Sequence, residues 1–416
     1  MAERPVEMSA LRDALFCPSR RVFLASAGAL VAWAAMPKAG FAGQARDPRF
    51  IAVILRGAMD GLAVVPPIGD ADYPKLRGDL AIGTPGHEDV LALDGFFGLN
   101  NAMPKLHAHY QKGDALLIHA AATAYRDRSH FDGQDVLESG MAGPRASRTG
   151  WLNRVAAALP KGENARPVSG LAAMPTVPLI LRGDAPTLTW TPPNLKTASA
   201  DTLTRLLDLY THEDPDLAKV LGAGIDVEAM ARGDGADAAG SSGGITAAFT
   251  ALASGSAKLL AADDGPRVAA LSFDGWDTHT NEGADSGRLS GLLGALDAAL
   301  DTLATELQPV WADTAIVVMT EFGRTARING NEGTDHGTAT TALLMGGAVK
   351  GGRVLADWPG LGQGNLYEDR DLKPTTDLRG VLKGVLRDHL GLAEPVLTAA
   401  IFPDSIGVKP IDGLIA

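Results

Sequence analysis

The fold is decided by the stretch Val268-Ala269-Ala270-Leu271-Ser272-Phe273-Asp274-Gly275-Trp276-Asp277-Thr278-His279. Its first half is a short run of mostly apolar residues that follow one another instead of alternating with polar ones. Such a run is typical of a strand whose two faces are both covered. Carboxylates and an imidazole come directly after it. The stretch therefore predicts a buried strand that carries reactive side chains at its carboxyl end.

Similar apolar runs recur along the chain, at residues 50–55, 115–119, 177–181, 315–320 and 342–345. Helical patterns lie between them, and in the clearest, Ser286 to Leu307, leucines recur at steps of three and four residues. Residues 201–209 and 378–390 predict two further helices. Because strands alternate with helices, we expect βαβ crossovers and an α/β fold with a mostly parallel central sheet, in a three-layer α/β/α sandwich. The last two strands are expected to lie parallel as well.

The first 45 residues have the form of an export signal. Ser19-Arg20-Arg21-Val22-Phe23-Leu24 resembles a twin-arginine motif, and an apolar run continues to Met36. This run is about fifteen residues long, whereas roughly 20 are needed to span a bilayer. We therefore expect a twin-arginine signal peptide at 1–45, export by the twin-arginine machinery and a periplasmic or secreted protein. The alternative is a buried helix of the mature chain.

Composition limits the possible domain organisation, partners and metal ligands of the chain. Residues 46–416 are expected to form one α/β domain, with a flexible connection near 222–244 that is rich in Gly, Ala and Asp. The formal net charge of −12 argues against nucleic acid as a partner. No segment after the leader has the long run of consecutive apolar residues that a membrane-spanning helix needs, so we expect no membrane span. The single cysteine, Cys17, lies in the leader, so any metal must be held by His, Asp, Glu or hydroxyl oxygen.

Residue types that bind metals collect at the expected strand ends. They are Asp60, Asp277, His279, Glu321, Asp335 and His336. Because the carboxyl ends of parallel strands meet at one edge of a sheet, we expect these side chains to lie together. Carboxylates mixed with imidazoles favour zinc or manganese, as one or two ions. Calcium and magnesium, which prefer oxygen ligands, are the alternatives.

Each of these residues also has an ordinary structural interpretation. Asp60 fits a turn residue, and Asp277 with His279 fits a cap of the following turn. Glu321 fits a surface ion pair with Arg324, and the acidic residue and histidine near position 335 fit a polar loop. That all of these residues reach one sheet edge by chance is a less favoured explanation than a shared metal site.

The run at 115–119 leads to a different motif. Arg128-Ser129-His130-Phe131 precedes a helical pattern that closes at Gly140. Ser129 is thereby placed near a helix N-terminus, where unpaired amides favour an anion or an ionising hydroxyl. Arg128 is suited to neutralising a phosphate or sulfate. The alternative is that Ser129 only caps the helix.

Five motifs follow the leader: Met59-Asp60-Gly61-Leu62, Arg128-Ser129-His130-Phe131, Asp277-Thr278-His279, Glu321-Phe322-Gly323-Arg324-Thr325 and Gly333-Thr334-Asp335-His336. In combination they resemble the family catalogued as domain of unknown function 1501, from the leader to about Leu355. That family is grouped with the alkaline phosphatase and sulfatase superfamily. The resemblance therefore implies an alkaline-phosphatase-like three-layer sandwich.

The resemblance also implies roles for single residues. Asp60 matches the metal-binding Asp that follows the superfamily's first strand, and Ser129 matches its nucleophile at a helix start. Arg128 or Arg324 would share the charge that develops on the substrate oxygens. The implied activity is that of an exported metal-dependent hydrolase, or transferase, acting on a small-molecule or polymer-borne phosphate or sulfate ester.

The match at the remaining positions is uneven. Asp277 and His279 match a metal-binding pair in type, although at a shorter spacing. His336, with Asp335 beside it, matches a final histidine ligand. Glu321-Phe322 stands where the superfamily has an Asp-His pair, which removes one imidazole. This departure favours a second hypothesis, a non-catalytic exported binding or assembly protein with a degenerate phosphatase-like site.

Overall fold

Strand β1 (Arg49–Arg56) lies in the middle of the central sheet. The computed structural model describes residues 47–84, 90–160, 168–192 and 244–416 and isolated residues between 207 and 224. Seven of the eight residues of β1 are buried. Phe50 and Ile54 face one hydrophobic core, and Ile51 and Val53 face the other. Burial on both faces explains why the sequence of β1 shows no polar alternation.

The central sheet has the strand order β10-β4-β9-β8-β1-β7-β5-β6, and β11 pairs with β4. Its other strands are β4 (Ala115–Ala122), β5 (Gly170–Ala173), β6 (Thr187–Thr189), β7 (Val268–Asp274), β8 (Thr314–Met319), β9 (Thr340–Met345), β10 (Arg353–Leu355) and β11 (Thr376–Asp377). β1 runs parallel to β7 and β8, with Ile51 opposite both Ala269 and Ile316. A separate small sheet pairs β2 (Val90–Ala92) with β3 (Gly98–Asn100).

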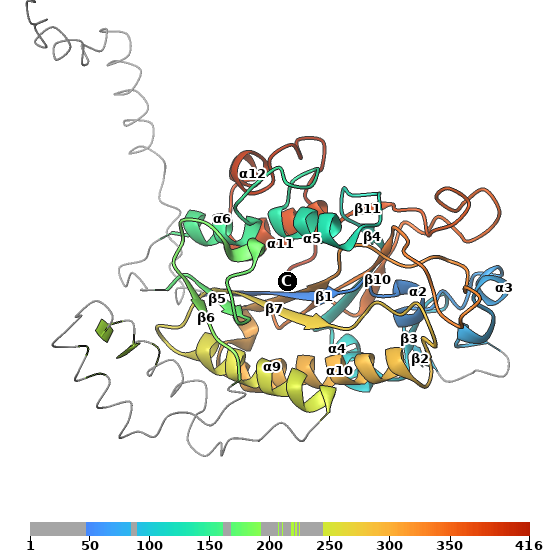
Figure 1. Ribbon diagram of the computed structural model, residues 1–416, viewed down its shortest axis with the longest axis horizontal. Helices are drawn as coiled ribbons and strands as arrows, with labels where there is room; N and C mark the ends of the chain where they lie inside the picture. The colour runs from blue at the N-terminus through green and yellow to red at the C-terminus, as the bar shows by residue number, and fades with distance from the viewer. Residues whose placement is uncertain are drawn as a thin grey trace, which may run out of the picture. The chain divides into compact units, whose positions relative to one another are not determined.

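Helices cover both faces of the central sheet, which gives three layers (Figure 1). One face carries α4 (Pro104–Lys112), α9 (Ile245–Ala261) and α10 (Arg288–Glu306). The opposite face carries α5 (His130–Ser139), α6 (Trp151–Ala158) and α11 (Leu378–Leu390). The shorter helices are α2 (Gly61–Val64), α3 (Tyr73–Arg77), α12 (Glu394–Val396), η1 (Gly78–Leu80), η2 (Leu179–Leu181), η3 (Gln308–Asp313) and η4 (Leu397–Ile401).

The structure confirms the expected α/β class, the mostly parallel sheet and most of the expected elements. Helix α11 has the predicted bounds, and α5 begins directly after Ser129 and ends at Gly140 in the left-handed conformation, as expected. The expected helix at 286–307 begins two residues later, at Arg288, because the left-handed Gly287 precedes it. Residues 1–45, most of 201–209 and most of 222–244 lie outside the described residues, and so do the predictions made for them.

Two of the expectations were wrong. The run at 177–181 is not a strand, because Pro178 precedes a single turn of 3₁₀ helix, η2. β9 is not parallel to its neighbours, since it pairs antiparallel with both β8 and β4. The connection from β8 to β9 contains no helix that could carry the chain back across the sheet, and β9 therefore starts at the edge where β8 ends.

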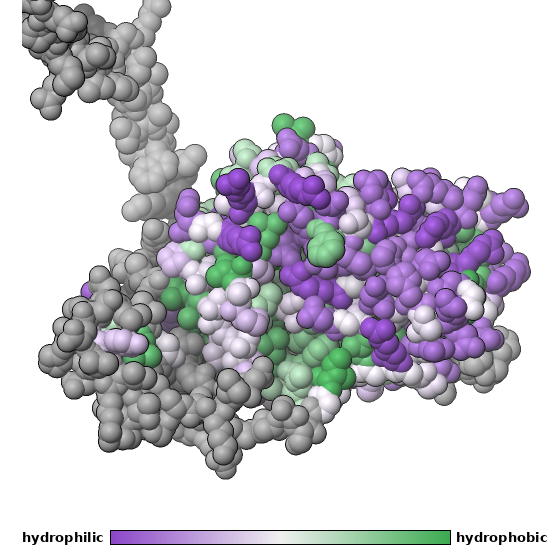
Figure 2. Space-filling model, viewed as in Figure 1, coloured by the Kyte–Doolittle hydropathy of each residue, from purple (hydrophilic) through white to green (hydrophobic). Residues whose placement is uncertain are grey.

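Residues Asp47–Ala416 form one compact unit. Hydrophilic residues dominate the right-hand part of the face in Figure 2, around α3, and apolar residues gather in smaller areas elsewhere on that face. None of the helices in the described part of the chain combines the length and apolar character that crossing a bilayer requires.

Candidate metal centre

Polar residues from three connections meet at one edge of the central sheet. β4, β7 and β8 end at this edge, and β9 begins there. His130 is the first residue of α5, which follows β4. Asp277 and His279 follow β7, Glu321 follows β8, and His336 precedes β9. This is the edge at which open α/β sheets hold their ligands.

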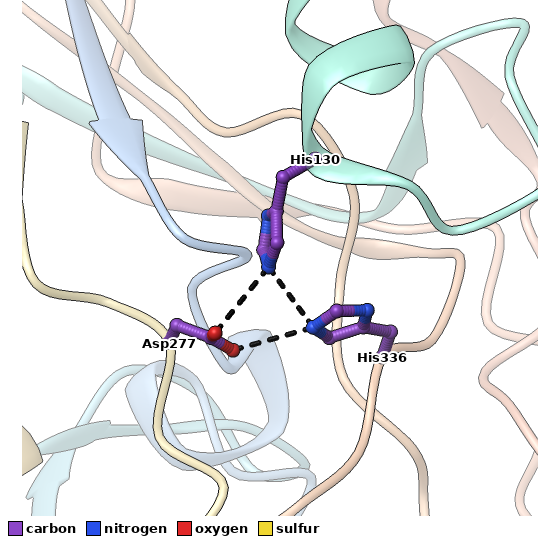
Figure 3. A group of neighbouring side chains, drawn as sticks. All are labelled: His130, Asp277 and His336. Carbon is purple, nitrogen blue, oxygen red and sulfur yellow. Dashed lines mark hydrogen bonds and ion pairs between the residues drawn. The ribbon is translucent and has the colours of Figure 1, made fainter.

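Figure 3 shows the imidazoles of His130 and His336 converging with the carboxylate of Asp277, and a third imidazole, that of His279, contacts two of these groups. Nε2 of His336 lies 2.9 Å from Nε2 of His130 and 2.9 Å from Nε2 of His279. Asp277 Oδ1 lies 3.1 Å from Nε2 of His279 and 3.3 Å from Nε2 of His336. Asp277 Oδ2 lies 3.5 Å from Nε2 of His130. In the described part of the chain, His130, Asp277 and His336 form the group whose ligand atoms lie within 4.8 Å of one another.

The opposite ring nitrogen of each histidine faces an oxygen that can only accept a hydrogen bond. Nδ1 of His130 lies 2.7 Å from Glu321 Oε1, and Nδ1 of His336 lies 3.0 Å from the carbonyl oxygen of Arg128. Nδ1 of His279 lies 3.3 Å from Asp335 Oδ1. Each neutral ring therefore carries its proton on Nδ1, which leaves the Nε2 lone pair directed at the common point.

Three lone pairs and a carboxylate at this spacing repel one another unless a cation lies between them. Ligands of a tetrahedral zinc ion, at bond lengths of about 2.0–2.1 Å, are roughly 3.3 Å apart. The separations among His130, Asp277 and His336, from 2.9 to 3.5 Å, fit that requirement. Oxygen acceptors on the far ring nitrogens are also the usual support for histidine ligands. His130, Asp277 and His336 therefore fit one divalent transition-metal ion, and His279, which contacts both His336 and Asp277, is the candidate fourth ligand.

Glu321 is the group that fixes His130. Its side chain is fully buried, and Oε1 also accepts from the backbone N of Gly57 at 2.9 Å and from Gln134 Nε2 at 3.2 Å. Burial raises the pKa of Glu321, but these hydrogen bonds, that of His130 foremost, lower it by more. The same hydrogen bond, which His130 donates to Glu321, raises the pKa of His130 against the effect of burial. The His130 ring also stacks on Phe322, at 5.0 Å between centroids.

Arg324 holds the carboxylate ligand in place. It is 1% exposed, and its Nη1 donates to Asp277 Oδ1 at 2.7 Å. Its Nε and Nη2 donate to the hydroxyl and carbonyl of Thr334, at 3.0 and 2.6 Å. Burial raises the pKa of Asp277, but the bond and charge of Arg324 outweigh it and lower the pKa. A fully engaged, buried guanidinium favours a role in orienting Asp277 over the substrate contact predicted for Arg324.

Arg128 and Ser129 lie at the entrance to α5. Arg128 has a left-handed backbone, with φ of 59°, which turns its carbonyl oxygen toward His336. Its guanidinium pairs with Glu368 and Asp371, each at 2.6 Å, and is therefore already neutralised. Ser129 is partly exposed, stands immediately before His130, and makes no side-chain capping hydrogen bond to α5. The Ser129 hydroxyl therefore does not cap α5, which was the alternative interpretation.

Asp60 does not join the cluster. It is 1% exposed and caps α2, with Oδ1 accepting from Leu62 N at 3.1 Å. Its Oδ2 accepts from Nη2 of Arg77, a residue that is fully buried. Both oxygens of Asp60 are thus occupied by protein donors, and the donor set does not fit a second metal ion at the position that the resemblance implies.

The six predicted ligand residues therefore have different surroundings. Asp277, His279 and His336 supply converging atoms, whereas Glu321 and Asp335 support histidine rings. His130 was missed by the sequence analysis, although its motif was quoted there. A signal existed, since a histidine at the first helical position after β4 stands at the same sheet edge as Asp277-Thr278-His279.

A groove of about 360 Å³ opens beside the centre, at the ends of β1, β5 and β7. Arg56, Arg182 and Asp274 supply its charges, and threonine, proline and methionine side chains supply much of the remaining wall. Arg56 Nη1 donates to Gln134 Oε1 at 2.6 Å, and Gln134 in turn donates to Glu321. Two hydrogen bonds thus connect the groove wall to the carboxylate that orients His130.

A family model described as "Protein of unknown function (DUF1501)" matches residues 47–401. No curated protein matches the sequence. One similar solved structure is Ps i-CgsB in complex with k-i-k-neocarrahexaose, with a TM-score of 0.45 and 11% identity, over 88% of this chain and 77% of that chain. The PsFucS1 sulfatase from Pseudoalteromonas sp. is similar with a TM-score of 0.40 and 13% identity, over 94% of this chain and 74% of that chain.

A third similar structure is an inactive form of murine ectonucleotide pyrophosphatase/phosphodiesterase 5 in complex with AMP. Its TM-score is 0.31 and its identity 12%, over 67% of this chain, which spans 57% of the length of that murine protein. At these scores and identities the three structures carry no argument about activity, which must be argued from the side chains of this chain.

Proposed function

The chain belongs to the DUF1501 family, and from that premise and the geometry of its centre we propose that it is a metal-dependent hydrolase of phosphate or sulfate esters with Ser129 as the nucleophile. One observation carries the metal part of the proposal. The Nδ1 atoms of His130, His279 and His336 all face oxygen acceptors, so three Nε2 lone pairs converge with the Asp277 carboxylate. Zinc and manganese suit this donor set best.

The proposed chemistry uses the entrance to α5. A bound divalent ion would supply the positive charge that lowers the pKa of a nearby hydroxyl and neutralises ester oxygens. The backbone amides of the first turn of α5 favour an anion at the same place. The oxygen of Ser129 would attack phosphorus or sulfur, and the ester bond would break. The leaving alcohol would depart with the proton that the hydroxyl loses.

Water would complete the reaction. It would break the bond between Ser129 and the phosphoryl or sulfo group, return a proton to the serine oxygen and release inorganic phosphate or sulfate. An alcohol in place of water would make the same chain a transferase. The groove lined by Arg56, Arg182 and Asp274 supports a site for the organic part of the ester, because it adjoins the centre and combines charged, hydroxyl and apolar surface.

The test combines metal analysis with an assay of 4-nitrophenyl phosphate and 4-nitrophenyl sulfate. We expect turnover only in protein loaded with zinc or manganese. Ser129→Ala should retain the metal and lose activity by about 10³-fold or more, since loss of a nucleophile is among the costliest single changes. A Ser129 adduct of one phosphoryl or sulfo group should be detectable by mass spectrometry. Ser254→Ala, in α9 on the far face of the sheet, is the matched control with unchanged activity.

The alternative outcomes separate the two hypotheses. Protein that binds a metal yet hydrolyses neither ester would support the exported binding or assembly protein. Protein that binds no divalent ion, and whose melting temperature is the same with and without chelator, would overturn the metal part. Wild-type rates in Ser129→Ala would remove the serine from the mechanism and leave a metal-activated water as nucleophile.

We further propose that the protein is exported through its N-terminal twin-arginine motif. The support is the sequence Arg20-Arg21 followed by an apolar run. Replacing both arginines by lysine should leave the protein inside cells of a host that has the twin-arginine machinery, as judged by fractionation. Unchanged export of the double variant would contradict this route.

A further inference from the structure

A carboxylate and a guanidinium are buried together close to the centre. Asp60 caps α2, and Arg77 is the last residue of α3. Arg77 donates through Nη2 to Asp60 and through Nη1 to the carbonyl oxygen of Thr325, at 3.2 Å. Neither residue is more than 1% exposed. Leu62 N donates to the other oxygen of Asp60, so both carboxylate oxygens accept from protein donors.

This pair belongs to a buried polar network that reaches the candidate metal ligands. Glu282 is fully buried, and its Oε2 accepts from the Thr334 hydroxyl at 2.7 Å. The same hydroxyl accepts from Arg324, which donates to Asp277. Burial raises the pKa of Glu282, and the nearby Asp60 carboxylate raises it further against the opposing charge of Arg77. Both effects disfavour a second negative charge beside Asp60.

Charge balance decides whether another ion can enter. The buried pair of Asp60 and Arg77 is already neutral, so a divalent ion beside it would bring uncompensated positive charge into a water-free position. An unpaired buried charge costs several kcal/mol even after relaxation. An ion at Asp60 would compete with the guanidinium, which is held by two acceptors.

We propose that the guanidinium of Arg77 takes the place of a second metal ion, so that the centre holds one divalent ion per chain, bound by His130, Asp277, His279 and His336. This inference rests on the proposed function for the presence of that one ion. The positive charge at Asp60 is then part of the polypeptide and does not depend on metal supply. Arg77 is a positioning residue, since it acts on Asp277 only through Glu282, Thr334 and Arg324.

The test counts ions per chain. Metal-stripped wild-type protein is titrated with Zn²⁺ and, separately, with Mn²⁺, passed through a gel-filtration column and analysed by elemental and native mass spectrometry. We expect one ion per chain at every excess of metal. Two ions per chain would overturn the inference and leave the proposed function intact. No ion at all would contradict the proposed function instead, so the two failures are distinguishable.

Variants test the role of Arg77 directly. Arg77→Ala should melt at a lower temperature without metal, bind a second ion at Asp60 and Glu282, and regain part of the lost melting temperature when metal is added. Arg49→Ala is the matched control, because Arg49 is 2% exposed and pairs with Asp47 at the opposite end of β1. It should lose stability and stay at one ion per chain. A folded Arg77→Ala protein that also stays at one ion would overturn the inference.

If Arg77→Ala does not fold, a variant of the first site keeps the inference testable. His336→Ala removes the nitrogen that contacts both other histidines. With a single site, its metal content should fall from one ion per chain to none at the same free metal concentration. An ion retained by His336→Ala and lost on Asp60→Asn would locate a second site at Asp60 and overturn the inference.

Discussion

At the scale of single residues, the centre depends on groups that hold the candidate metal ligands in place without binding the metal themselves. Glu321 fixes the ring of His130, the Arg128 carbonyl fixes that of His336, and Arg324 fixes Asp277. Such partners set which nitrogen of each imidazole carries the proton. Loss of a partner is therefore expected to change metal affinity before it changes the fold.

Glu321→Gln tests this dependence. The amide keeps the size of the side chain but removes the negative charge that holds the Nδ1 proton of His130, so metal affinity should fall by about 10–100-fold. Competition with a chromogenic chelator measures the change. Glu138→Gln is the matched control, because this buried carboxylate of α5 pairs with Arg56 and makes no contact with His130. An unchanged affinity in Glu321→Gln would contradict the support that we assign to Glu321.

His119 predicts a pH dependence of stability. It is fully buried in β4, where Nε2 contacts the Val65 carbonyl at 2.9 Å and Nδ1 accepts from Ala120 N at 2.8 Å. Burial lowers its pKa to about 4. Because the unfolded chain takes up this proton near pH 6.5 and the folded chain does not, stability falls as the pH drops from about 6.5 to 4.

The size of this effect follows from the shift in pKa, and it amounts to about 3 kcal/mol at the acid end of the window. Urea unfolding of metal-free protein at several pH values measures it, and His119→Gln should flatten the slope in this window. Gln111→Ala, at an exposed position of α4 that does not titrate, should leave the slope unchanged. Equal slopes in wild-type protein and His119→Gln would contradict the prediction.

The residue scale also shows where the sequence was informative. Asp277-Thr278-His279 could be recognised because the ligands follow directly after an apolar run. His130 could not be given a role, since the residues that define it, Glu321 and His336, are far away in the chain and meet it only in the folded protein. The ion pair of Asp60 with Arg77 was hidden for the same reason, as an isolated Arg in a short helix carries no distinguishing pattern.

At the scale of elements, close backbone contacts hold the loops of the centre in register. Gly57 follows β1 with φ of +121°, and a Cβ at this position would lie 2.5 Å from the backbone N of Asp277. A Cβ on Gly333 would lie 2.5 Å from the carbonyl oxygen of His279. Both glycines let one ligand-bearing loop pack directly against another.

Gly57→Ala is expected to disturb this packing. The new methyl group clashes with the segment that carries Asp277, and the residue is strained at positive φ, so unfolding should become easier by about 1–3 kcal/mol and metal affinity should fall. Urea unfolding and metal competition measure the two effects. Gly291→Ala is the control, because this exposed residue of α10 has open space around it and alanine favours helix. Equal stability of Gly57→Ala and wild-type protein would contradict the prediction.

The elements themselves were largely predictable, and the exceptions have physical reasons. Apolar runs identified β1, β4, β7, β8 and β9 because both faces of the sheet are covered. The direction of β9 could not be predicted, since it depends on whether a helix intervenes after β8 and the loop sequence carried no clear signal. The run at 177–181 has the composition of a strand, yet Pro178 starts a 3₁₀ turn there.

At the scale of the whole molecule, a bound ion would link three connections of the sheet, those after β4 and β7 and the one between β8 and β9. Such an ion binds the folded chain and not the unfolded one, so it stabilises by mass action. Free metal at 100 times its dissociation constant should add about 2.7 kcal/mol to the free energy of unfolding. Thermal melts with zinc or manganese, and with chelator, measure this. His336→Ala should show no such difference, and an equally large metal effect in that variant would place the stabilising ion elsewhere.

The reversed direction of β9 has a consequence for how such a centre can change over time. Residues 320–339 leave the sheet after β8 and return to the same edge at β9. Glu321, Arg324, Asp335 and His336 all belong to this one excursion. Because one uninterrupted segment carries all four residues, an insertion, deletion or substitution within it would alter a candidate metal ligand and three supporting side chains together, while the order of the strands stays the same.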